Sequence, residues 1–116
     1  MELEIFWSQL AEDKLKDIFD YYKVKAGLKI ARKIVNQIID KTIDLDQNPK
    51  IGQIEDLLNH KKFEFRYLIS TNYKIIYYIN LETKRIIIAN AFDARQNPAV
   101  TTSVMVSKFS LSKFAP

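Results

Sequence analysis

Two stretches in the N-terminal half carry apolar residues at every third or fourth position, which is the spacing of a helix that buries one face. The first stretch predicts a helix over residues 9–23, and Ser8 is a good N-cap because its hydroxyl can accept from the free amides of the first turn. The second predicts a helix over residues 28–46, which ends before Pro49 because proline cannot continue the hydrogen-bond ladder. Only Gly27 breaks the pattern between them, so the helices are predicted to form an antiparallel hairpin. The expected buried stripes are Ala11, Leu15, Ile18 and Tyr22 in the first helix, and Ala31, Ile34, Val35, Ile38, Thr42 and Leu45 in the second.

Strands are predicted on both sides of this hairpin. Residues 3–7 form a short first strand. From Phe63 onward apolar and polar side chains alternate, a period of two that predicts two strands joined by a turn, and residues 85–92 form a last strand. Residues 49–62 between the two halves have no regular pattern.

The length of the loop between the first two of these later strands decides which side chains share a face of the sheet. A three-residue loop, 70–72, would pair Ile69 with Tyr73 and gather the large apolar side chains on one face. We expect this register because it separates apolar from charged residues best, and it places Arg66 and Lys74 together on the opposite face. The expected apolar face comprises Phe63, Phe65, Tyr67, Ile69, Tyr73, Ile75, Tyr77 and Ile79.

These elements predict an α+β domain over residues 1–98, in which the helical hairpin packs on one face of a curved antiparallel sheet and the other face presents basic groups. Residues 99–116 are rich in Val, Ser and Thr and have no clear period. We interpret them as a C-terminal extension, and three alternatives stay open for it: disorder, folding onto a partner, and an extra docked strand.

Composition and charge narrow the classes of function. The 116 residues include no cysteine, which excludes disulfides, thiolate metal sites and a cysteine nucleophile. No apolar run approaches the roughly 18 residues of a membrane span, and the first four residues are acidic where a signal peptide would be basic, so we expect a cytoplasmic protein with no membrane partner. Residues 1–48 hold 8 Lys and Arg against 9 Asp and Glu, whereas residues 49–116 hold 10 against 5. The C-terminal half is therefore expected to face an anion, either a nucleic acid or an acidic protein.

Several short segments occur in an order that resembles a known family. They are residues 11–18 followed by Tyr21 and Tyr22, residues 48–52, residues 66–69, residues 73–79 and residues 92–98. In this order, over residues 3–98, the chain resembles the RelE/ParE superfamily of toxins from type II toxin–antitoxin systems, which serve in plasmid stabilization. The resemblance implies a RelE-like fold, no cofactor, and a cognate antitoxin that wraps the toxin and neutralises it. It also implies one of two activities: RelE-like members are mRNA interferases that cleave mRNA in the ribosomal A site, and ParE-like members poison DNA gyrase without nuclease activity.

For a nuclease, the resemblance implies that Arg66, Lys74 and Arg95 are the catalytic basic residues. Cleavage of RNA by its 2′-hydroxyl needs a base, stabilisation of the phosphorane charge and a proton for the leaving oxygen. Most RelE-like enzymes achieve this without metal, using Lys, Arg and Tyr or His. A lysine can act as the base only if its pKa is lowered, and an arginine can clamp phosphate with two parallel bonds. Lys61 and Lys62 are expected to hold phosphates of the nucleic-acid backbone. If the chain is an enzyme, we therefore expect a metal-independent mRNA endoribonuclease.

Other residues weigh against that activity. Many RelE-like nucleases use a C-terminal Tyr or His as the general acid, and neither residue type follows Arg95, while the only histidine, His60, lies in the preceding loop. Tyr67 and Tyr78 can stack on bases or pack in the core. Our first hypothesis is growth arrest by ribosome-dependent mRNA cleavage. Two alternatives stay open: gyrase poisoning, and an inactive binding module of the same fold whose basic residues bind an acidic antitoxin or form surface ion pairs.

Overall fold

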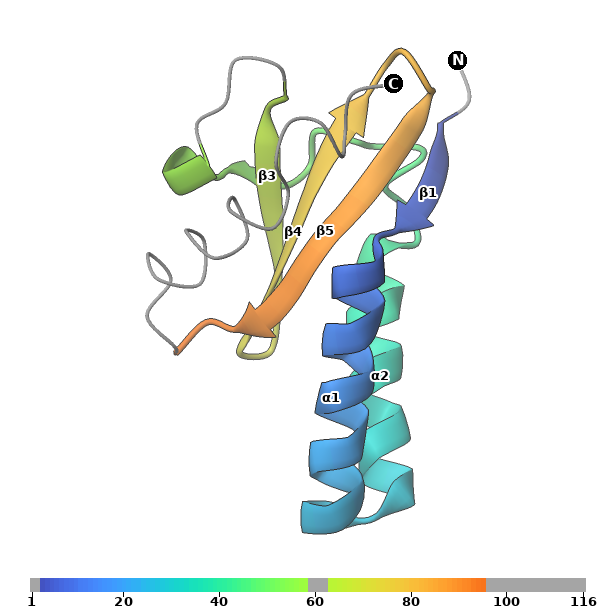
Figure 1. Cartoon of the computed structure of the whole chain (residues 1–116), viewed down its shortest axis with the longest axis vertical. Helices are drawn as coiled ribbons and strands as arrows, with labels where there is room; N and C mark the ends of the chain where they lie inside the picture. The colour runs from blue at the N-terminus through green and yellow to red at the C-terminus, as the bar shows by residue number, and fades with distance from the viewer. Residues whose placement is uncertain (1–2, 59–62, 96–116) are drawn as a thin grey trace.

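The computed structural model describes residues 3–58 and 63–95. Figure 1 shows a helical hairpin beside a twisted sheet, which confirms the predicted α+β class and the pairing of the two helices. The elements follow one another as β1 (Glu4–Trp7), α1 (Gln9–Ala26), α2 (Leu28–Thr42), β2 (Gln53–Ile54), the 3-10 turn η1 (Asp56–Leu58), β3 (Phe65–Ser70), β4 (Tyr73–Asn80) and β5 (Arg85–Asp93). No helix in these two ranges is both long enough and apolar enough to cross a bilayer.

The sheet is mixed, with strand order β1-β5-β4-β3-β2. Strands β3 to β5 pair antiparallel as predicted, and the short strand β2, which was not predicted, pairs antiparallel with β3. The prediction of a wholly antiparallel sheet is wrong at β1, which pairs parallel with β5 from Glu4 opposite Arg85 to Trp7 opposite Ile88. A parallel pair needs a long connection between its strands. Here the helical hairpin follows β1 in the sequence and carries the chain across one face of the sheet before the other strands begin.

Ser8 caps α1 as predicted and also ties the helix to the sheet. The Ala11 amide donates to Ser8 Oγ at 3.1 Å, and the same hydroxyl donates to the Ala89 carbonyl at 3.0 Å. The Ser8 amide donates to the Ile88 carbonyl, which continues the ladder between β1 and β5. One side chain therefore fixes both the start of α1 and its position against the centre of the sheet.

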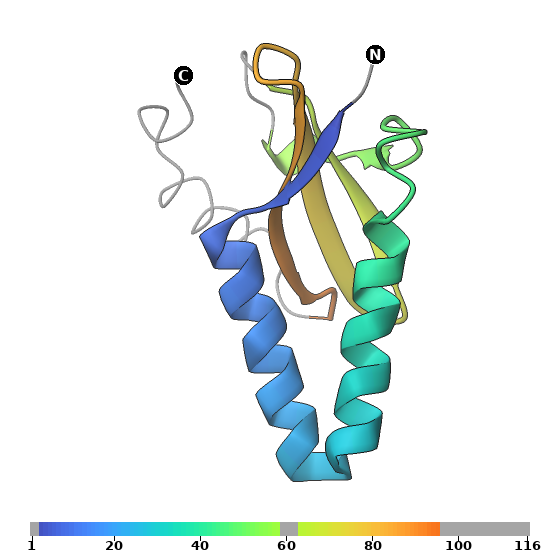
Figure 2. The same ribbon diagram turned by 90° about the vertical axis from the view of Figure 1, so that its right-hand side faces the viewer.

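Both predicted helices are present, with shifted ends. Helix α1 continues to Ala26, three residues further than expected, and stops at Gly27, whose φ of 96° belongs to the region that glycine adopts readily. Helix α2 ends at Thr42, where the hydroxyl donates to the Ile39 carbonyl at 2.8 Å, and turns follow it up to residue 47. Figure 2 shows the helices diverging from Gly27 toward β1.

Apolar side chains are buried on both faces of the sheet. The face covered by the helices has a core made of Ala11, Ile38, Leu45, Tyr73, Ile75, Tyr77, Ile86 and Ile88, against which Leu15, Ile18, Tyr22 and Ile34 pack. The far face has a second cluster made of Leu58, Phe63, Ile76, Tyr78, Ile87, Ala89 and Phe92. The predicted helix stripes are thus confirmed except at Val35, which lies outside this core and is only half-buried. The expectation of a single apolar face is wrong.

The predicted three-residue loop between β3 and β4 is also wrong, because it was chosen to gather the apolar side chains on one face. The turn between β3 and β4 has two residues, so Ser70 pairs with Tyr73 and Ile69 pairs with Lys74. At its start Thr71 adopts a φ of 55°, which is uncommon for a β-branched residue. Choosing the register that collects all apolar residues on one face fails here because the protein buries large side chains on both.

Candidate functional site

Arg66 lies on the helix-covered face of β3, opposite Tyr77 of β4. One guanidinium nitrogen donates to the Gly52 carbonyl at 2.8 Å and to the Lys50 carbonyl at 3.3 Å, and the other pairs with Glu64 at 2.7 Å. The side chain is only 14% exposed. Arg66 therefore fastens the 50–52 segment to the sheet.

The same segment is held from a second side by Tyr77. Its hydroxyl accepts from the Gly52 amide at 2.9 Å and donates to the Pro49 carbonyl at 2.8 Å. Burial raises the pKa of the Tyr77 hydroxyl, so it stays protonated and keeps this donor. A glycine is required at position 52, because a Cβ there would come 2.6 Å from the Tyr77 hydroxyl oxygen and 2.7 Å from the Tyr67 carbonyl oxygen.

Lys74 lies on the far face of the sheet, beside Ile69 of β3. Its ammonium pairs with Glu55, a residue only 5% exposed, and lies 4.2 Å from the centre of the Tyr67 ring. Tyr67 in turn donates to Gln53 Oε1 at 2.8 Å. Lys74 thus joins β4 to the chain around β2, and its side chain is 14% exposed.

The predicted basic surface shared by Arg66 and Lys74 is therefore wrong. The two side chains point to opposite faces of the sheet, and each is largely buried in contacts within the chain. The error follows from the register, because moving the pairing by one position transfers Lys74 to the other side. The catalytic roles assigned to them remain predictions, but the structure does not bring the two groups to one phosphate.

Arg95 lies just beyond β5 and is the most exposed of the three, at 73% of its side chain. It makes a forked pair with Asp93, with contacts from 2.6 Å to 3.1 Å. Hydrogen bonds from Arg95 hold the pKa of the Asp93 carboxyl well below its usual range. Nearby, the Tyr73 and Tyr22 hydroxyls lie 3.3 Å apart, and burial raises the pKa of Tyr73.

The remaining predicted binding residues, Lys61 and Lys62, lie outside the described residues, as do His60 and the extension 99–116. Tyr78 packs in the far core against Phe63 and Phe65, with ring centroids 4.6 Å and 5.0 Å away. Within residues 3–58 and 63–95, no group of three His, Asp or Glu residues is placed to hold a metal ion.

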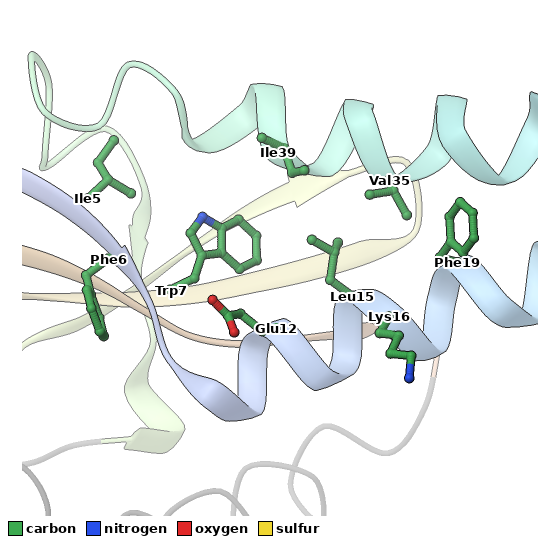
Figure 3. Close-up of a pocket in the computed structure, with 9 residues that line it drawn as sticks. All are labelled: Ile5, Phe6, Trp7, Glu12, Leu15, Lys16, Phe19, Val35 and Ile39. Atoms are coloured by element: carbon green, nitrogen blue, oxygen red, sulfur yellow. The ribbon is translucent and has the colours of Figure 1, made fainter.

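An apolar groove of about 580 Å³ lies where the two helices diverge from each other beside β1. Figure 3 shows the Trp7 ring between the helices, with Leu15 of α1 and Ile39 of α2 on either side of it. Farther along the groove Phe19 points toward Val35. The groove is completed by Ile5, Phe6, Glu12 and Lys16.

The sequence pattern does not predict this groove. Phe19 lies beside the predicted stripe of α1, and Val35, which the pattern places in the buried stripe of α2, lines the groove instead. Trp7 gave a second signal as a bulky residue on a short strand. Only the angle between the helices turns these residues into one surface.

Comparison with known proteins identifies the family. Residues 5–98 match the family described as "ParE toxin of type II toxin-antitoxin system, parDE". This chain belongs to the ParE toxin family. The match covers most of the chain and agrees with the resemblance stated from the sequence to the RelE/ParE superfamily.

Solved structures show the same fold at low sequence identity. A structure of the chromosomal ParDE toxin–antitoxin system from P. aeruginosa has a TM-score of 0.68 at 21% identity, over 81% of this chain and 98% of that one. A mutant of the E. coli toxin RelE in the free state has a TM-score of 0.61 at 12% identity, over 95% and 100%. The archaeal RelE–RelB complex from Pyrococcus horikoshii has a TM-score of 0.58 at 12% identity, over 84% and 100%. No curated protein sequence matches this ParE-family toxin.

Proposed function

We propose that this toxin arrests growth by poisoning DNA gyrase and does not cleave mRNA. The observation that supports the proposal is the separation of Arg66 and Lys74 onto opposite faces of the sheet. Cleavage of RNA needs several groups around one phosphate, and each of these two is already engaged with carboxylates and carbonyls of its own chain. The match to the ParE family and the similarity to a ParDE system add support for the ParE-like activity.

The experiment is induction of the chain in a bacterium, followed by mapping of mRNA ends and of covalent gyrase–DNA adducts. We expect adducts to accumulate while mRNA stays intact. Cleavage within ribosomal A sites without adducts would refute the proposal, and harmless expression would favour an inactive binding module.

Arg95→Ala provides a matched test, because this residue is exposed and its loss leaves the core untouched. Lys84→Ala, another exposed cation, is the control. We expect both variants to yield intact mRNA. The nuclease alternative requires mRNA cleavage in the parent chain and its loss in Arg95→Ala alone.

We further propose that a cognate antitoxin neutralises the toxin by seating apolar side chains in the groove beside β1. The groove is lined mainly by apolar residues from three elements, and such grooves between helices suit an amphipathic segment of a partner. Trp7 is the chain's only tryptophan and lies inside the groove, so its fluorescence should report occupancy directly.

This part is tested with the product of a small acidic open reading frame beside the toxin gene. We expect a change in Trp7 fluorescence on binding, and a loss of affinity of roughly tenfold or more in Ile39→Glu. Ile39 lines the groove and is 37% exposed, whereas Ile43 on the same helix end is 60% exposed and lies outside it. Ile43→Glu is therefore the control, and equal affinity loss in both variants would place the antitoxin elsewhere.

A further inference from the structure

The far end of the helical hairpin protrudes from the body of the protein. Figures 1 and 2 show both helices continuing past the end of the sheet to their connection at Gly27. We call residues 21–33 the basic tip, because they include five lysines and arginines and no acidic residue. The five are Lys23, Lys25, Lys29, Arg32 and Lys33, and all of them are exposed. The whole chain has a net charge of +4 and the tip carries +5, so the remaining residues together carry a net charge of −1.

The positive charges on the α2 side of the tip destabilise the helix. Lys29, Arg32 and Lys33 stand at spacings of three and four residues, where like charges repel each other. Lys29 also lies in the first turn of α2, at the positive end of the helix dipole. Acidic residues are absent from this first turn, and Gly27 offers no side-chain cap.

Nothing in the described part of the chain neutralises the three cations of α2, whereas Lys23 and Lys25 lie in the last turn of α1, where the negative end of the helix dipole favours them. No residue within the ranges 3–58 and 63–95 forms an ion pair with any of the five, although Lys25 lies 5.5 Å from the centre of the Tyr21 ring. An unfavourable arrangement of this kind is explained if an anion from outside the chain completes it.

The arrangement fits a polyanion better than a lipid surface. On the helix, Lys29 and Lys33 lie on the side opposite the buried Ala31, Arg32 lies next to them, and together the three form one exposed stripe. Interfacial helices need a broad, continuous apolar face. The exposed large apolar residues of the tip alternate along the sequence with its cations instead; they are Tyr21, Val24, Leu28 and Ile30, at 54%, 90%, 41% and 40% exposure.

The arrangement of cations on the basic tip also fits a nucleic acid better than an acidic protein. Protein partners usually anchor in an apolar pocket, and the described apolar groove lies at the other end of the hairpin. From Lys29 to Lys33 the helix rises about 6 Å, a length over which each DNA strand presents about two phosphates.

We infer that the basic tip binds the phosphate backbone of double-stranded DNA without regard to sequence. This goes beyond the proposed function, because it assigns a nucleic-acid contact to the toxin itself and does not depend on which enzyme the toxin inhibits. A toxin that acts on a DNA-bound target would gain from such a contact, since both partners would then be held on one molecule.

The test measures binding of the full chain to a short fluorescent DNA duplex by anisotropy, between about 50 and 200 mM salt. The test variant combines Lys29→Gln, Arg32→Gln and Lys33→Gln, and the control combines Lys41→Gln, Lys50→Gln and Lys84→Gln, three exposed residues whose replacement lowers the net charge equally. Loss of three phosphate contacts should reduce the slope of log affinity against log salt by about 2.7. The control should change the slope by less than one contact's share, about 0.9.

Thermal melting of the same proteins separates a binding role from a structural one. The test variant should melt at the same or a higher temperature, because it removes repulsion within α2. Equal weakening of DNA binding in both triple variants would overturn the inference, as would absence of binding to DNA at the lowest salt. Tighter binding to phosphatidylserine vesicles or to polyglutamate than to the duplex would assign the tip to a membrane or to an acidic protein instead. If the parent chain binds DNA but forms no gyrase–DNA adducts, that result contradicts the proposed function and leaves the inference about the basic tip intact.

Discussion

Replacement of Lys74 by methionine distinguishes a structural lysine from a catalytic one. Lys74→Met keeps the length of the side chain but removes the charge that faces Glu55, a carboxylate only 5% exposed. Breaking a buried ion pair by removing one partner costs about 3–5 kcal/mol, and we take the lower end because Lys74 itself is 14% exposed. The cation–π contact with the Tyr67 ring is lost as well. We therefore expect about 3 kcal/mol of destabilisation, which corresponds to a fall of about 12 °C or more in Tm for a domain of this size.

Urea unfolding followed by far-UV circular dichroism measures this effect, with a midpoint expected to fall by roughly 1–3 M. The double variant Lys74→Met, Glu55→Gln removes both charges together and should recover most of the lost stability, because a buried pair can be replaced by neutral groups at little cost. If Lys74 is structural, toxicity falls in the single variant and returns in the double. The reasoning is refuted if Lys74→Met is as stable as the parent. It is refuted equally if the double variant is stable and still harmless, since that result would make the lysine itself essential to toxicity.

Three further changes test individual contacts. Gly52→Ala should destabilise the fold by about 1–3 kcal/mol in urea titrations, since the new Cβ would meet the Tyr77 hydroxyl at 2.6 Å; a neutral effect would mean that the segment moves freely. Ser8→Ala should cost about 1–2 kcal/mol, because both the α1 cap and the bond to the Ala89 carbonyl are lost; thermal melting with Gln9→Ala as the control measures it. The depressed pKa of Asp93 stabilises the fold above the ordinary carboxyl pKa of about 3.9, and this contribution is lost as pH falls through the lower folded value. The parent should therefore exceed Asp93→Asn in stability at pH 7 and approach it near pH 2, and a constant difference across that range would contradict the pKa shift.

The helical part of the fold could be predicted because its signals are local. The stripe from Ala11 to Tyr22 and the cap at Ser8 lie within a few turns of one helix, and both are present. Gly27 likewise ends α1 through its own backbone conformation. The order of these elements along the sequence is what carries the resemblance to the family.

The candidate site could not be predicted in the same way, because it depends on contacts between distant segments. Whether Lys74 shares a face with Arg66 depends on one residue of loop length, and the two-residue turn requires a positive φ at Thr71, which propensity disfavours. The partner of Lys74 is Glu55, which lies in a stretch without a periodic pattern. The groove around Trp7 depends on the angle between two helices, a property that no single segment encodes.

The parallel pairing of β1 with β5 has a consequence for how the protein folds while it is being synthesised. Ser8 and Ala89, which bond to each other beside this pair, are 81 positions apart in the chain. At roughly 5–20 residues per second, the ribosome takes about 4–16 s to make the intervening stretch. During that time α1 and α2 can form from nearby contacts, but β1 still lacks the strand beside which it must lie. The nascent chain therefore acquires its complete sheet only after β5 has been made, and the groove that β1 helps to line is complete only then.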